Sequence, residues 1–138
     1  MSILDLNFQV PDPVVVPAGE YQIKLDSVDL QESKSERNPG HPMLKMVFSN
    51  VTKPEAVRIY NYMRLPVDTD EAEAKLGRNR QLKWAANALN VQTANVQTQE
   101  DLVNAFKAAC GNVCWVTLGV EAGPLGDSNS IKKFTQRG

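Results

Sequence analysis

Five stretches of this chain alternate apolar and polar residues, and this alternation is the strongest signal in the sequence. A period of two is typical of a β-strand that buries one face. Within the first stretch the apolar positions change phase between Leu25 and Val28, which is the pattern of a strand bent by a β-bulge. The alternation predicts strands at 19–30, 43–51, 56–65, 112–121 and 130–136.

The apolar faces of these strands predict the core. In the third strand the inward residues are expected to be Val57, Ile59, Met63 and Leu65. They should be buried against the second strand, through Leu44, Met46 and Phe48. The fourth strand is expected to add Cys114, Val116, Leu118 and Val120.

The spacing changes to that of helices between the third and fourth strands. A first helix is expected to start at Thr69 or Asp70 and to end at Asn90, with Gly77 marking a break or a late start. Trp84 lies across this helix from the apolar stripe, so we expect it to be exposed. The stripe itself consists of Leu82, Ala85, Ala86 and Leu89.

A second, shorter helix is predicted at 99–110, ended by Gly111. Its apolar side is expected to consist of Leu102, Phe106 and Ala109. Three strands, a helical segment and two further strands follow one another in the order of the OB fold. The predicted fold class is therefore mainly β: a five-stranded OB-type Greek-key barrel with a helical segment between strands 3 and 4.

The length of 138 residues suits a single domain, 1–138, with one buried core. Its first part, 1–17, is predicted to be an extended N-terminal arm, because Pro11, Pro13 and Pro17 interrupt its apolar residues. No apolar run is long enough to span a bilayer, and the start lacks the basic and apolar segments of a secretory signal. We therefore expect a cytoplasmic protein.

Composition narrows the possible functions. The net charge of −1 argues against coating duplex DNA through charge alone, so any nucleic-acid site must be local. Two cysteines and the single His41 cannot supply the four ligands of a zinc site, and we expect no metal and no cofactor. His41 stands alone in a loop, and no nucleophile elbow or phosphate-binding glycine loop is present. We expect no enzymatic activity.

One face of the third strand carries candidate chemistry. Arg58, Tyr60, Tyr62 and Arg64 alternate there, so that two aromatic rings are bracketed by two guanidinium groups. Rings can stack on unpaired bases and guanidinium groups can meet phosphates, which makes this face a candidate platform for single-stranded nucleic acid. Alternatively, the tyrosines only cover the barrel and the arginines keep the strand soluble.

Further basic and aromatic residues are candidates for the same surface. Lys45 of the neighbouring strand extends it or is simply solvated, and Trp115 is either a third stacking ring or an anchor for the helices. Loops between strands 1 and 2 and between strands 4 and 5 border ligands in OB folds. The first holds Lys34 and Arg37; Lys132 and Lys133 follow the second, and only one of these two lysines is expected to line the groove.

Several short strings occur in an order that resembles a known family: Ile3-Leu4-Asp5, Pro17-Ala18-Gly19-Glu20-Tyr21, Glu32-Ser33-Lys34, Pro42-Met43-Leu44-Lys45, and Gly111 before the fourth strand. The chain resembles, over almost its whole length, the bacteriophage OB-fold single-stranded-DNA-binding proteins long catalogued as a domain of unknown function. The resemblance implies an accessory of phage DNA replication, recombination or repair that protects single strands in the host cytoplasm. It implies replication or recombination proteins as partners, leaves homo-oligomerisation open, and names no contact residues.

A protein-interaction module is the competing class, either an OB-like adaptor or a virion component without nucleic-acid binding. In that class Tyr60, Tyr62 and Trp115 contact another protein. Salt separates the two, because oligonucleotide binding weakens steeply as salt rises, whereas an aromatic protein interface does not.

Overall fold

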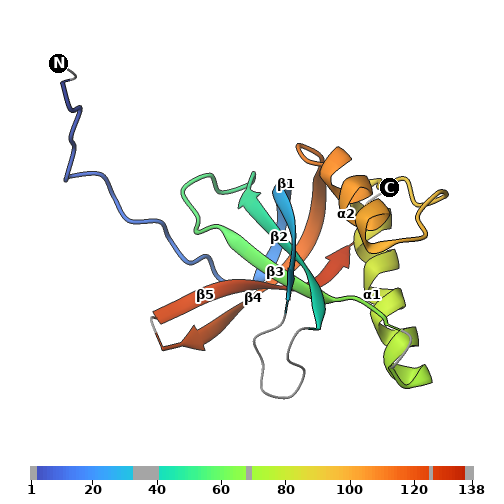
Figure 1. Cartoon of the computed structure of the whole chain (residues 1–138). Helices are drawn as coiled ribbons and strands as arrows, with labels where there is room; N and C mark the ends of the chain where they lie inside the picture. Colours follow the sequence, from blue (N-terminus) through green and yellow to red (C-terminus); the bar gives the residue numbers. More distant parts are fainter. Residues whose placement is uncertain (1–2, 33–40, 68–69, 125, 136–138) are drawn as a thin grey trace.

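The computed structural model describes residues 3–32, 41–67, 70–124 and 126–135, and Figure 1 shows their path. Three strands come first: β1 (Gly19–Glu32), β2 (Pro42–Asn50) and β3 (Ile59–Arg64). Two helices follow, α1 (Ala72–Leu89) and α2 (Gln99–Ala108), and then β4 (Val113–Gly123) and β5 (Gly126–Thr135). The predicted mainly β fold, with helices between strands 3 and 4, is confirmed.

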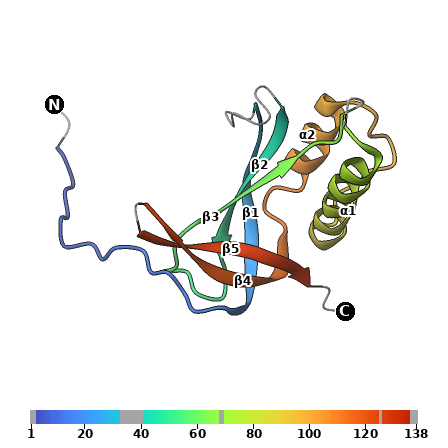
Figure 2. The same ribbon diagram turned by 90° about the horizontal axis from the view of Figure 1, so that it is seen from below.

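The strands form one antiparallel sheet in the order β3-β2-β1-β4-β5. β1 is shared: its first half pairs with β4, from Gly19↔Leu118 to Lys24↔Val113, and its second half pairs with β2. The predicted bulge is confirmed between Leu25 and Ser27, where the register with β2 shifts. The bend in β1 curls the sheet, which Figure 2 shows from below. β3 and β5 are the two edges of the sheet.

The core lies on the inner face of the curled sheet. Leu44 pairs with Met63, and Phe48 pairs with Ile59, so the predicted contact between β2 and β3 is confirmed. Val57 is only half-buried, because it precedes β3 and has no β2 partner. The largest fully buried side chains include Phe48, Phe106, Ile23, Leu25, Leu44 and Met46.

One predicted core residue is wrong. Cys114, Val116 and Leu118 are buried, but Val120 is 44% exposed. The pairing of β1 with β4 ends at Leu118, so Val120 lies on the part of the β4–β5 hairpin that extends beyond β1 and has no third strand beside it. Figure 1 shows this hairpin projecting from the body of the sheet.

α1 buries the predicted stripe and ends at Asn90, whose φ of 57° closes the helix in the left-handed conformation. The predicted break at Gly77 is wrong, because the helix runs through it; one glycine costs a helix only about 1 kcal/mol. The predicted cap is also wrong. Glu71 occupies the N-cap, and the Asp70 carboxylate instead accepts a hydrogen bond from the Val67 N–H. Thr69 lies outside the described residues.

α2 begins with a capping box between Thr98 and Asp101. Its buried side holds Val103 and Phe106, with Ala109 just after the helix, whereas the predicted Leu102 is only half-buried. The helix turns its apolar side toward β1, and the backbone N–H of Gly111 donates to the Leu25 carbonyl at 2.7 Å. This contact fixes the entry into β4.

Candidate nucleic-acid interface

The outer face of β3 carries the predicted row of basic and aromatic residues. Tyr60 is 52% exposed and Tyr62 is 49% exposed, although their neighbours in sequence, Ile59 and Met63, are buried. Arg58 is exposed just before the strand, and Arg64 is half-buried at its end. The alternation of β3 therefore places all four on one face, as predicted.

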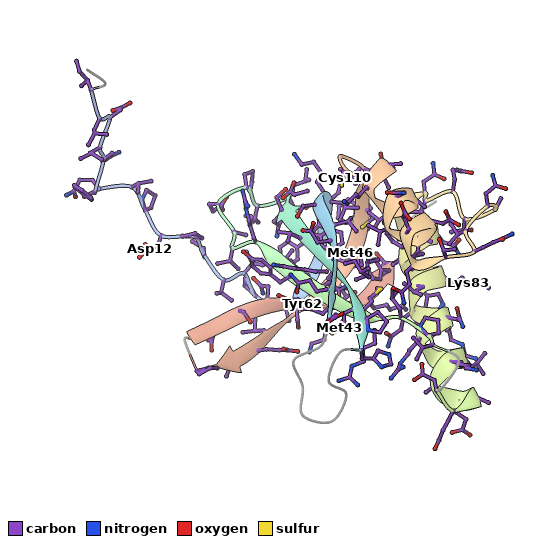
Figure 3. The ribbon with its side chains drawn as sticks, viewed as in Figure 1. Asp12, Met43, Met46, Tyr62, Lys83 and Cys110 are labelled. Carbon is purple, nitrogen blue, oxygen red and sulfur yellow. The ribbon has the colours of Figure 1, made fainter. Side chains whose placement is uncertain are left out.

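Lys45 joins this face from β2, as expected. It pairs directly with Tyr62, and its Nζ lies 5.6 Å from the centroid of the Tyr60 ring, a cation–π distance. Met43 of β2 pairs with Arg64, and Figure 3 labels Met43 and Tyr62 on these two neighbouring strands. The face that consists of Arg58, Tyr60, Tyr62, Arg64 and Lys45 is called the tyrosine face below. It combines two exposed rings with three cationic side chains.

The tip of the β4–β5 hairpin borders the tyrosine face. A shallow hollow of about 520 Å³ is lined by Arg58 and Tyr60 on one side and by Asp127 and Ser128 of the hairpin on the other. The connection between strands 4 and 5 thus reaches the candidate surface, in agreement with the OB-like expectation. Lys34 and Arg37, from the connection between strands 1 and 2, lie outside the described residues.

Trp115 is not part of the tyrosine face. It is half-buried on β4, where it pairs with Gln22 of β1 and Thr135 of β5. Two strands separate β4 from β3 in the sheet, which amounts to roughly 14 Å at the usual strand spacing. A single base stacked on Tyr62 therefore does not reach Trp115, and its role as a further stacking ring for another nucleotide or as an anchor for the helices stays a prediction.

Lys132 and Lys133 lie on β5, near a second hollow. The Lys132 side chain passes over Gly119, so a Cβ there would displace it, and its Nζ donates to Glu121 Oε1 at 2.7 Å. That hydrogen bond lowers the pKa of the Glu121 carboxyl. Both lysines line this hollow, which is separate from the tyrosine face, so which of them lines the expected ligand groove stays a prediction. The register shift between Thr117 and Leu118 inserts an extra residue into β5 and breaks its simple alternation.

This second hollow is a groove of about 830 Å³ between β3, β5 and α1, and the sequence did not predict it. Its walls include Met63 from β3, Trp84 from α1 and Phe134 from β5. The only local signal was Trp84, predicted to be exposed and found 52% exposed. The groove depends on how two strand edges and a helix meet, which no local pattern encodes.

His41 does not stand alone, contrary to expectation. Its Nε2 lies 3.0 Å from the Leu65 carbonyl oxygen and 2.9 Å from Arg78 Nη1. Arg78 in turn pairs with Asp70. A hydrogen bond from the Val67 N–H, joined by Arg78, lowers the pKa of the Asp70 carboxyl. These side chains fasten the end of β3 to α1.

The described residues contain no group of three or more His, Cys, Asp or Glu side chains able to hold a metal ion. Cys114 is buried, and burial raises its pKa to about 12, so it remains a neutral thiol in the core. Among the described helices, none has the length and apolar character needed to cross a membrane. No protein-family model matches this chain, and no curated protein sequence matches it.

Proposed function

We propose that this protein is a non-catalytic single-stranded-DNA-binding protein that uses the tyrosine face as its platform. The exposed pair Tyr60 and Tyr62 carries the proposal. Two large rings on a strand otherwise well packed gain little by standing half in water, yet an aromatic ring is the surface that unpaired bases stack on. Three cations around the rings supply phosphate contacts that the acidic overall composition does not.

The proposed fold is the OB barrel. β1 bends and pairs with both β2 and β4, and the two edges β3 and β5 also contact each other. A five-stranded Greek-key barrel that stays partly open fits this pairing, and OB domains bind nucleic acid on the face of strands 2 and 3. Lys45 and the tyrosines lie on those two strands, and the hairpin between strands 4 and 5 borders them.

The proposed biological setting is that of the resemblance: a phage accessory of DNA replication, recombination or repair, acting in the host cytoplasm. In this setting the protein protects single strands, and replication or recombination proteins are its partners. A small platform that stacks bases without reading their edges suits such a role, because stacking tolerates any sequence.

A titration with fluorescent oligo-dT, followed by anisotropy, tests the proposal. Single strands should bind more tightly than duplex at the same salt, because a duplex keeps its base faces closed. Tyr60→Ala and Tyr62→Ala should each weaken binding by about 1–3 kcal/mol for the base lost from the stack, with the salt dependence nearly unchanged. Tyr60→Phe and Tyr62→Phe are the matched controls and should bind like the parent.

A folded Tyr60→Ala, Tyr62→Ala double variant that binds oligo-dT as well as the parent would exclude the tyrosine face as the platform. Equal affinity for single strands and duplex would contradict the proposed function as a whole.

A protein-interaction module is the second candidate, favoured by the net charge of −1 and by the exposed rings. The same titration separates the two functions. Oligonucleotide affinity that falls steeply with salt favours DNA binding, whereas an adaptor shows no such affinity at any salt.

A further inference from the structure

An exposed segment whose sequence alternates like a strand precedes the folded part of the chain, although in this structure it forms no strand and turns at Phe8–Gln9. In 3–10, Asp5, Asn7 and Gln9 alternate with apolar residues, which is the pattern of a strand with one apolar face. The exposed fraction reaches 93% for Ile3 and 86% for Phe8. The apolar face of the segment consists of Leu4, Leu6, Phe8 and Val10, all exposed. A row of large apolar side chains in water marks an interaction site.

The groove between β3, β5 and α1 has the features that would accept such a segment as an added strand. Four consecutive residues of β5, 131–134, line it. The register shift at Lys132 breaks the alternation of β5 here, and together with the position of β5 at the sheet edge it lets consecutive residues border one hollow. β5 is an edge of the sheet, and such an edge is a template for a further strand. Met63, Trp84 and Phe134 provide apolar walls.

The arm points away from the groove of its own chain. Val14 forms a parallel bridge with Ala56, so the chain before Val14 runs opposite to the direction in which β3 continues. Two residues further on, the Asn129 side chain holds Val16 in place: its Oδ1 accepts from the Val16 N–H, and its Nδ2 donates to the Val16 carbonyl. Figures 1 and 2 both show the arm leaving on the side opposite α1. A second copy is therefore the occupant that this geometry favours.

Charge supports the same pairing. The arm segment 3–13 carries Asp5 and Asp12 and no basic residue. The groove is lined by two lysines of β5, Lys133 and Lys132, of which Lys132 is paired with Glu121. Figure 3 shows Asp12 of the arm and Lys83 of α1, the helix that borders the groove, on opposite sides of the molecule.

We propose that the arm of one copy docks as an added strand in the groove of a second copy, with its apolar face toward Met63, Trp84 and Phe134. Backbone hydrogen bonds to the part of the β5 edge that borders the groove provide affinity, and the apolar side chains provide register. Because arm and groove are different surfaces, the contact is heterologous, and each added copy offers a free arm or groove to the next.

Sedimentation of the full-length protein without nucleic acid tests this assembly. The parent should associate as its concentration rises. Leu6→Ser with Phe8→Ser should weaken association at least about tenfold, because it removes two apolar side chains that docking would bury. Asn7→Ser with Gln9→Ser, on the opposite face of the arm, is the matched control and should associate like the parent. A parent that stays monomeric, or association that survives the Leu6, Phe8 change, overturns the proposal.

Mixing two defective variants identifies the surfaces. Trp84→Glu places a charge at an exposed position of the groove, so it leaves the fold intact and blocks the groove. Alone, neither this variant nor the Leu6, Phe8 variant should associate. Mixed, they should form a one-to-one complex and nothing larger, because only one intact arm and one intact groove remain. Failure to form this complex overturns the proposal.

A photo-reactive phenylalanine at position 8 locates the contact. In a mixture of light and ¹⁵N-labelled chains, cross-links should join position 8 of one chain to 81–84 or 131–134 of the other. Cross-links confined to single chains would identify the occupant as the arm's own copy and overturn the proposal. So would a monomeric protein in which Trp84→Glu weakens oligo-dT binding, since the groove would then take nucleic acid. All three experiments stand apart from the proposed function, because self-association is measured without DNA.

Discussion

The two faces of β3 differ in what the fold requires of them. The inner face, with Ile59 and Met63, is buried against β2, and its apolar residues are required for packing of the core. The outer face, with Tyr60 and Tyr62, stands about half in water and makes one notable contact, the cation–π pair of Tyr60 with Lys45. Within this one strand, residues needed for folding alternate with residues available for binding. The two roles can be tested separately, because substitutions on the inner face should lower stability and substitutions on the outer face should weaken binding.

The largest effect is expected on the inner face. Ile59→Ala should lower the free energy of unfolding by about 2–5 kcal/mol, because it removes a fully buried side chain and leaves a cavity. Urea denaturation measures this loss. Ile3→Ala makes the same chemical change at an exposed position of the arm and should leave stability unchanged. Similar losses in both variants would contradict the placement of the core.

A smaller effect on stability is expected on the outer face. Tyr60→Ala should cost about 0.5–1 kcal/mol of unfolding free energy, because it removes a cross-strand ring and its cation–π contact with Lys45. Tyr60→Phe keeps the ring and should cost less. Were Tyr60→Ala as damaging as Ile59→Ala, the ring would belong to the core, and the contrast between the two faces would fail.

The sequence predicted those parts of the fold that depend on local periodicity. Alternation located the strands and the two faces of β3, and the helical stripe of α1 was found from its spacing. Val120 was misplaced because its burial depends on where the neighbouring β1 begins, at Gly19 opposite Leu118. His41 was thought solitary because its partners, Arg78 and the Leu65 carbonyl, are distant in sequence.

For the candidate site, too, the sequence predicted the features that lie within one strand and missed those that depend on several elements. The tyrosine face follows from one strand and its register with β2, so alternation sufficed. Trp115 was considered for the same surface because alternation gives the face of a residue but not how many strands lie between it and another residue. The groove requires β3, β5 and α1 to meet, and nothing in the spacing of any one of them encodes that meeting.

Acid should loosen the end of β3 that carries Arg64. The pKa of Asp70 is lowered in the folded state, so its carboxylate stabilises the fold above its unfolded pKa, and this stabilisation is lost as pH falls through the folded pKa. Asp70→Asn should therefore lose less stability than the parent between neutral pH and a pH below the ordinary value of 3.8. Asp127→Asn, an exposed hairpin carboxylate, is the control. Parallel acid profiles for parent and Asp70→Asn would contradict this role.

The smallest expected effect concerns the charges of the tyrosine face. Arg58 is exposed beside Tyr60, and it is expected to neutralise one phosphate when a strand lies across the rings. Arg58→Ala should then weaken oligo-dT binding modestly and flatten the slope of log affinity against log salt by roughly 0.7, the value for one phosphate of a single strand. Lys45→Ala should flatten it by a similar amount.

Lys107→Ala removes an exposed cation of α2, far from the face in sequence and on a different element, and should leave the slope unchanged. Anisotropy titrations at several salt concentrations measure all three slopes. If the Lys107 variant flattens the slope as much as the Arg58 variant, the phosphate backbone does not follow the tyrosine face, and the rings and the charges of β3 do not act on the same ligand.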